Sequence, residues 1–215
     1  MEKIDISIVI RTKNEERWIK RCIDKIQNQK IAKNFEIIIV DSGSSDKTIE
    51  KVKEFDLKII HIDEYKPGLS INKGVEKTKG NIIVLISAHA IPYDEYWLEN
   101  LTKPFDEKGK IVATYGRQIP AEWSDPNDIR DLAITFGLED RLQKKDTFFH
   151  NANSAFLKIF WEKNKFDEMA TNIEDRIWAE IIIKNNFYIK YVANSIVYHW
   201  HGIHHYGNAS RAKST

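Results

Sequence analysis

Short apolar runs alternate with helical patterns along the first half of the chain. Four runs rich in β-branched residues predict buried strands, at 6–10, 36–40, 57–61 and 82–86. Apolar residues at helical spacing predict helices between these strands, at about 18–26, 46–55 and 70–78. Strands that alternate with helices form right-handed βαβ units, so the pattern predicts an α/β fold with a mostly parallel central sheet flanked by helices.

The second half of the chain has a less regular pattern. Apolar spacing predicts helices around 98–105 and at 175–184, and short apolar runs predict strands at 111–115, 188–192 and 196–198. Residues 116–150 are polar, aromatic and irregular, which is typical of a loop or lid that faces a ligand. No linker or internal repeat interrupts the pattern, so we expect a single domain.

Composition narrows the classes of protein to consider. With 215 residues, 42% of them hydrophobic and 30% charged, the chain has the balance of one globular domain. The formal net charge is +1, so no broad basic field indicates nucleic-acid binding. Cys22 is the only cysteine, which excludes an internal disulfide and a multi-cysteine zinc site, and its helical position predicts a buried thiol.

The apolar pattern also bears on location. No apolar run reaches the ~18 residues that span a bilayer. A strand begins within the first few residues, which leaves no room for a signal peptide. The sequence therefore predicts a cytoplasmic protein. Peripheral contact with the inner face of a membrane is compatible with this prediction, because a lipid-linked ligand requires no membrane span.

Polar clusters follow three of the predicted strands. Residues 11–15 follow the first strand, Asp41 and Ser42 follow the second, and residues 87–90 follow the fourth. In an open α/β sheet, ligands bind beyond the carboxyl ends of the strands. A loop or a helix cap explains any one of these clusters, but the three together favour a nucleotide-binding cleft.

The order of these clusters resembles family 2 glycosyltransferases with the Rossmann-like GT-A fold. The segments that carry the resemblance are 8–16, 38–48, 72–74, 78–85 and 172–176. The resemblance covers roughly residues 5–200 and implies inverting transfer of a sugar from a nucleotide-sugar donor to a glycan or lipid-linked acceptor, as in cell-surface polysaccharide synthesis. It also implies one catalytic domain over 1–215, with a nucleotide-binding half at 1–90 and an acceptor-binding and catalytic half at 91–215.

The resemblance implies a set of donor-binding residues. These are Thr12, Lys13, Asn14, Glu15, Asp41, Ser42, Lys73, Ser87, His89 and Arg117. Asp41 would accept a hydrogen bond from the base or ribose, although it could instead cap the turn that follows its strand. Lys73 would meet the donor phosphate, and a solvated lysine on a helix is an equal alternative.

Catalysis and acceptor binding are expected from the second half. Direct displacement at a sugar carbon needs a base for the acceptor hydroxyl, and Asp175 matches the acidic motif of the family. Glu174 is the alternate base or an orienter of acceptor hydroxyls, while compensation of a helix dipole would also explain both acids. The residues expected to bind the acceptor are Gln118, Trp123, His150, Asn151 and Asn153, with Trp123 as a sugar-stacking platform.

The chain departs from the family where a metal is expected. The family usually has Asp-x-Asp after the fourth strand, and this chain has Ser87-Ala88-His89. Magnesium prefers oxygen ligands, so manganese or zinc is favoured over magnesium, bound by His89 with His199 or His201. Catalysis without a metal is the alternative. The histidines at 199, 201, 204 and 205 also resemble an exposed metal-scavenging tract.

Two other functions remain to be weighed. A sugar nucleotidyltransferase shares the architecture, but it needs a glycine-rich loop after the first strand, and residues 11–15 contain no glycine. A degenerate transferase fold, kept as a nucleotide-binding or scaffold module, is favoured by the missing Asp-x-Asp. The retained Asp41, Glu174 and Asp175 oppose that interpretation.

Overall fold

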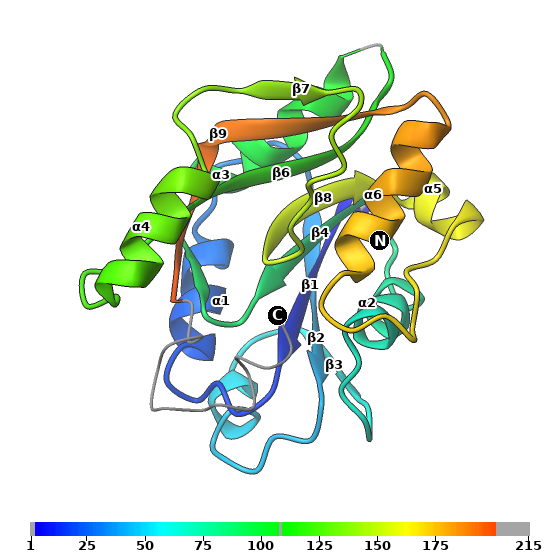
Figure 1. Cartoon of the computed structure of the whole chain (residues 1–215). Helices are drawn as coiled ribbons and strands as arrows, with labels where there is room; N and C mark the ends of the chain where they lie inside the picture. The colour runs from blue at the N-terminus through cyan, green and yellow to red at the C-terminus, as the bar shows by residue number, and fades with distance from the viewer. Residues whose placement is uncertain (1–2, 108, 201–215) are drawn as a thin grey trace.

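The computed structural model describes residues 3–107 and 109–200 and contains one sheet with helices on both faces (Figure 1). The strands are β1 (Ile6–Thr12), β2 (Phe35–Asp41), β3 (Lys58–His61), β4 (Ile82–Ser87), β5 (Ala90–Pro92), β6 (Ile111–Ile119), β7 (Arg141–Gln143), β8 (Asn153–Leu157) and β9 (Tyr188–His199). The α-helices are α1 (Ile19–Gln27), α2 (Pro67–Val75), α3 (Trp97–Thr102), α4 (Pro126–Thr135), α5 (Lys158–Lys163) and α6 (Glu174–Lys184). The short 3-10 helices are η1 (Glu50–Val52) and η2 (Lys103–Asp106). The predicted α/β architecture is confirmed.

The first half of the chain builds the parallel part of the sheet. Strands β3, β2, β1 and β4 lie in that order and all pair in parallel, with Ile8 of β1 opposite both Ile37 and Val84. Successive residues of β1 face opposite sides, so Ile8 packs in the core under α1 and α3 and Val9 in the core under α2 and α6. Parallel pairing brings the carboxyl ends of these strands to one edge of the sheet.

The second half adds mixed pairing. Strand β8 lies between β4 and β6 and runs antiparallel to both, while β6 and β9 are parallel. The two predicted strands at 188–192 and 196–198 form the single strand β9, and its register with β6 shifts between Gly116 and Arg117. The fully buried Asn153 lies at that irregularity, where its amide donates to the carbonyls of Arg117 and Ser195. The sheet is therefore parallel on one side and mixed on the other.

Two predicted segments differ from expectation. The only helical segment in residues 46–55 is the single turn η1. The side chains of Asp46 and Thr48 accept hydrogen bonds from the backbone amides of residues 16 and 15 in the neighbouring loop, and such bonds compete with helix formation. Residues 116–150 are more regular than predicted and contain α4 and β7. Helix α4 begins at Pro126, and Asp125 caps it by accepting a hydrogen bond from the Asn127 amide.

Two further expectations concern burial and the membrane. Cys22 is fully buried, as predicted, and burial raises the pKa of its thiol. None of the helices in the described ranges is long and apolar enough to cross a membrane.

Asn72 ties α2 to the segment that follows α5. The residue is 1% exposed, and its side-chain oxygen accepts hydrogen bonds from Trp161 Nε1 at 2.8 Å and the Phe166 amide at 3.1 Å. Its side-chain nitrogen donates to the Phe166 carbonyl and to Glu168 Oε1, both at 2.9 Å. The Asn72 side chain thus pairs with buried polar groups of Trp161 and Phe166, which lie 89 and 94 residues further along the chain.

Asn72→Ala is therefore expected to lower the free energy of unfolding by about 2–4 kcal/mol, since it leaves the Trp161 and Phe166 donors unpaired in the core. Urea denaturation followed by tryptophan fluorescence measures the change. Asn185→Ala is the matched control, because the Asn185 side chain bonds the Ile181 carbonyl on an exposed helix end. Equal stability of the two variants would contradict the role assigned to Asn72.

Candidate active site

A cleft of about 580 Å³ opens at the carboxyl ends of the parallel strands. It is lined by Arg11, Thr12, Lys13, Asn14, Glu15, Arg17, Trp18, Tyr65, Ser87, His89 and Trp200. Six of the ten predicted donor-binding residues line it: Thr12 to Glu15 at the end of β1 and just beyond it, and Ser87 and His89 at the end of β4 and just beyond it. The structure thus brings together two of the three polar clusters that the sequence indicated.

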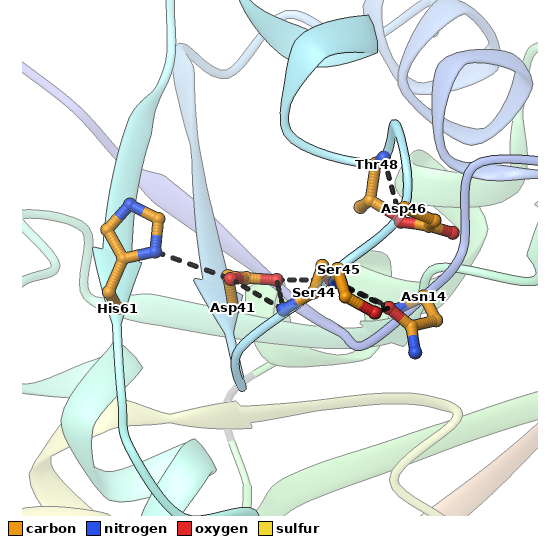
Figure 2. A network of polar contacts seen from close by, with 7 residues as sticks. All are labelled: Asn14, Asp41, Ser44, Ser45, Asp46, Thr48 and His61. Carbon is orange, nitrogen blue, oxygen red and sulfur yellow. Dashed lines mark hydrogen bonds and ion pairs between the residues drawn. The ribbon is translucent and has the colours of Figure 1, made fainter.

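The loop after β1 is locked to the loop after β2. Asn14 has a φ of 54°, in the left-handed region that asparagine tolerates. Its amide donates to Ser44 Oγ at 2.9 Å, and its side-chain oxygen accepts from the Ser45 amide at 2.8 Å (Figure 2). The Glu15 amide donates to Thr48 Oγ1 at 2.7 Å. These reciprocal bonds make the two loops one rigid wall of the cleft.

Asp41 is buried and does not line the cleft. The residue is 2% exposed, and its carboxylate accepts from the Ser44 amide and, at 2.5 Å, from the Ser44 hydroxyl. His61 Nδ1 lies 3.3 Å from Asp41 Oδ2 on the other side (Figure 2). The alternative role of Asp41, as the cap of the turn after β2, is therefore present in the structure. The neighbouring Ser42 is equally buried.

Two imidazoles stack beside the end of β4, His89 from the segment after that strand and His199 from β9. His89 Nδ1 lies 2.7 Å from Glu15 Oε1, and the His89 ring lies 5.1 Å from the His199 ring with planes 7° apart. His199 Nδ1 in turn lies 2.5 Å from Gln118 Oε1. A line of side chains, Glu15, His89, His199 and Gln118, therefore crosses the site.

The described residues do not by themselves fit a metal ion. Over residues 3–107 and 109–200, no three His, Cys, Asp or Glu side chains are grouped to hold one. The Nδ1 atoms of His89 and His199 are already engaged by Glu15 and Gln118. His201, the other predicted ligand, lies outside the described residues.

Glu174 lies buried at the first turn of α6. It is 4% exposed, and its carboxylate lies 3.7 Å from Arg11 Nη1 and accepts from Asn151 Nδ2 at 3.3 Å. Burial raises the pKa of Glu174, and the positive charge of Arg11 offsets part of that rise. Arg11 also lines the cleft, so it connects the cleft to this carboxylate.

Asp175 is more accessible than its neighbour. Its side chain is partly exposed, and Oδ1 accepts a hydrogen bond from the Arg176 amide at 2.8 Å. Burial raises the pKa of Asp175, while backbone hydrogen bonds from Arg176 and Asn151 lower it in part. The two adjacent acids therefore differ: Glu174 is held by a buried ion pair with Arg11, and Asp175 is a partly exposed residue whose carboxylate accepts a backbone hydrogen bond.

His150 lies between the imidazole pair and the carboxylate pair. Its ring meets the His199 ring edge-on, with centroids 6.1 Å apart, and its Nδ1 accepts from the Ala152 amide at 3.3 Å. Burial and the charges of Arg11 and Arg176 lower the pKa of His150 to about 4. The side chain is thus neutral at physiological pH.

Asn153 corrects one acceptor-binding prediction. Its side-chain oxygen accepts from Trp97 Nε1 at 2.9 Å, and its nitrogen donates to the two carbonyls at the irregularity of β9. The residue is fully buried, so its amide stabilises the core and does not reach a ligand. A polar residue in a strand gives no sign from sequence alone of which face it occupies.

Three other predicted residues lie outside the cleft lining. Lys73 is in the last turn of α2, where its ammonium lies 3.9 Å from a carboxylate oxygen of Glu76. It is not among the residues that line the cleft. Arg117 is on β6, and its Nε is buried with no hydrogen-bond partner among the described residues. Trp123 lies beside the cleft and stacks on Trp18 at 5.8 Å.

Several lining residues were not predicted as binding residues. They are Arg11, Arg17, Trp18, Tyr65 and Trp200. Arg11 was recognisable, because it begins the polar cluster after the first strand. Trp18 lies in a predicted helix and carries the signal of a core residue, while Tyr65 and Trp200 reach the cleft only through the fold.

The fold matches solved glycosyltransferase structures. A mannosyltransferase, PcManGT from Pyrobaculum calidifontis in complex with GDP-Man and Mn²⁺, superposes with a TM-score of 0.73 over 98% of this chain and 60% of that one, at 17% sequence identity. At this identity the likeness establishes the fold, which is the GT-A fold of nucleotide-sugar transferases.

The sequence establishes the family. A sequence model of Glycosyl transferase family 2 matches residues 7–163, and the chain belongs to that family. The O-antigen chain rhamnosyltransferase RfbN of Salmonella typhimurium is 26% identical over 210 residues, covering 91% of this chain and 66% of its own length. A dolichyl N-acetyl-alpha-D-glucosaminyl phosphate 3-beta-D-2,3-diacetamido-2,3-dideoxy-beta-D-glucuronosyltransferase of Methanococcus voltae is 34% identical over 104 residues, covering 45% of this chain and 32% of its own. The chain thus spans less than two thirds of the length of these relatives.

The lowered pKa of His150 predicts a specific acid response. A histidine whose pKa falls from 6.5 to about 4 on folding favours the folded state above pH 6.5, and this contribution is lost as the pH falls toward 4. His150→Asn keeps a polar group near Nδ1 but does not titrate. Between pH 6.5 and 4, the free energy of unfolding is expected to fall less in the variant than in the wild type, and the difference between the two decreases is at most about 3 kcal/mol. Urea unfolding at a series of pH values checks this, and parallel curves would show that His150 does not couple folding to protons.

Proposed function

We propose that the chain transfers a sugar from a nucleotide-sugar donor to an acceptor hydroxyl with inversion at the anomeric carbon. The observation that carries the proposal is the continuity of the site. Arg11 lines the cleft at the carboxyl edge of the sheet and also contacts Glu174, whose neighbour Asp175 is a partly exposed residue. A donor in the cleft would therefore lie next to a base.

The cleft suits the donor's diphosphate and nucleoside. Arg11, Lys13 and Arg17 line it with positive charge. Among the described lining residues Glu15 is the single acid, and it pairs with His89. Tyr65 offers an exposed aromatic ring for a base. In the proposed division of the chain, residues 1–90 supply most of this donor site and 91–215 supply the catalytic acids.

Asp175 is proposed as the general base and Glu174 as a positioning residue. In the displacement, Asp175 takes the proton of the acceptor hydroxyl, the oxygen forms a bond to the anomeric carbon, and the bond to the phosphate oxygen breaks. The electron pair leaves with the nucleotide. Glu174 cannot easily take this role, because its carboxylate is buried and already paired with Arg11 and Asn151. His150 and Asn151 remain proposed contacts of the acceptor.

The acceptor is proposed to be a glycan or a lipid-linked sugar. The names of the Salmonella and Methanococcus relatives refer to an O-antigen chain and to a dolichyl phosphate sugar. Both are glycans or glycolipids with hydroxyls to glycosylate. We propose on this basis that the chain works in cell-surface polysaccharide synthesis, in the cytoplasm or peripherally at the inner face of the membrane.

Asp175→Asn separates catalysis from binding. Turnover is expected to fall by roughly a hundredfold or more, which is the usual scale for removing a general base. Nucleotide affinity should stay close to the wild-type value, because Asp175 does not line the cleft. A panel of nucleotide sugars, assayed for hydrolysis and transfer and titrated by calorimetry, measures both quantities.

Asp131→Asn is the matched control, since Asp131 is an exposed acid paired with Arg130 on α4. Wild-type turnover in Asp175→Asn would remove Asp175 from the mechanism. Nucleotide binding by the wild-type protein without any turnover would favour the scaffold function over the transferase function.

The loss of the acidic motif predicts weak dependence on magnesium. A hydroxyl and an imidazole, Ser87 and His89, stand where two hard carboxylates are usual, and magnesium prefers oxygen ligands. Activity is expected either to persist in excess chelator or to return with manganese or zinc rather than magnesium, and in the second case His89→Ala should abolish the rescue. Turnover with each ion added back after chelation measures this. Complete loss in chelator, restored by magnesium alone, would overturn the expectation.

A further inference from the structure

A second pocket, of about 280 Å³, opens beside the cleft. It shares three wall residues with the cleft: Trp18, His89 and Trp200. The rest of its wall is formed by Arg21, Ile91, Ala121, Glu122, Trp123 and Tyr198. A ligand in this pocket would therefore lie next to a donor in the cleft, and the transfer reaction as described above leaves the pocket unused.

Aromatic rings dominate one side of the pocket. Trp18 and Trp123 stack with centroids 5.8 Å apart and planes 11° from parallel, and Trp200 packs on Trp18 at 5.7 Å. The guanidinium of Arg17 lies 4.6 Å, 5.9 Å and 5.5 Å from the Trp18, Trp123 and Trp200 rings. Stacking and cation–π contacts thus hold the indoles in a fixed array.

Trp123 keeps a large part of this array open to solvent. The residue is 47% exposed, whereas Trp97, Trp161 and Trp178 are buried in the core. Trp123 lies in the segment between β6 and α4 and belongs to neither of the two core clusters. An indole at the mouth of a pocket is suited to a ligand with a flat, partly apolar face.

The polar groups of the pocket narrow the chemistry of that ligand. Arg21 and Glu122 carry opposite charges, and His89 contributes an imidazole. An anion would meet the carboxylate of Glu122, and an apolar peptide would leave both charged groups without partners. A neutral ring with many hydroxyls can bond to donors and acceptors of both kinds while its carbon face stacks on an indole.

We propose that this pocket binds a sugar unit of the acceptor, stacked on Trp123. The inference rests on the transferase function proposed above and specifies its acceptor. His89 lines the pocket, its ring contacts the His199 ring, and the His199 ring contacts His150. His150 directly precedes Asn151, which bonds to Glu174. The pocket is therefore two ring contacts away from the segment that bonds to the carboxylate pair. The unit in the pocket is therefore a sugar behind the one that reacts, and the enzyme should prefer acceptors longer than one sugar.

Saturation-transfer NMR with methyl glycosides of glucose, galactose, mannose, rhamnose and N-acetylglucosamine tests the pocket directly. At least one glycoside should bind the wild-type protein, and Trp123→Ala should weaken that binding by about tenfold or more, the scale of one aromatic contact. Trp123→Phe should recover part of it. Tyr96→Ala is the matched control, because Tyr96 is an equally exposed aromatic residue, 45% accessible, that lines neither pocket.

Calorimetry with UDP and GDP separates this inference from the proposed function. Unchanged nucleotide affinity in Trp123→Ala, together with weakened glycoside binding, supports the sugar site. Glycoside binding that depends on Trp123 in a protein without nucleotide affinity would support the pocket and refute the transferase. The inference is overturned if no glycoside binds, if binding is the same in Trp123→Ala, or if that variant loses nucleotide affinity instead.

Discussion

The ion pair between Arg11 and Glu174 joins the two working parts of this molecule. Arg11 is the second-last residue of β1 and lines the cleft, and Glu174 begins α6 in the other half of the chain. Their side chains are only 12% and 5% exposed, so removing either partner would leave a buried charge without compensation. Asn151 donates to the same carboxylate and brings the segment before β8 into the same contact. The position of the proposed catalytic acids relative to the cleft therefore depends on this pair.

The wall of the cleft is rigid for a related reason. Short polar side chains, chiefly Asn14, Ser44 and Thr48, bond to the backbone of the facing loop instead of extending a helix. Such local bonds compete with helix formation, which explains why only one turn forms after β2. Asp41 holds this turn from behind, and a role in nucleotide recognition would act together with that structural role.

Environment separates neighbouring groups of the same chemistry. Glu174 and Asp175 are adjacent acids, but Glu174 is buried beside Arg11 and Asp175 is partly exposed. The imidazoles also differ: His89 is paired with the carboxylate of Glu15, whereas desolvation and the charges of Arg11 and Arg176 lower the pKa of His150. The tryptophans also differ in environment: Trp97, Trp161 and Trp178 are buried in the core, whereas Trp123 is 47% exposed and lies near Arg17.

The sequence by itself determined the parallel half of the sheet, the helices α1 and α6, and the polar clusters at the strand ends. Apolar periodicity carries this information, because buried strands and amphipathic helices repeat on a local scale. The tertiary structure decided what depends on distant partners. Asn153 and Lys73 were both expected to bind ligands. Hydrogen bonds to β6 and β9 bury the Asn153 amide, and Lys73 pairs with Glu76 and does not line the cleft. The array of Trp18, Trp123 and Trp200 likewise forms only when three separate segments meet, and no local pattern encodes such a meeting.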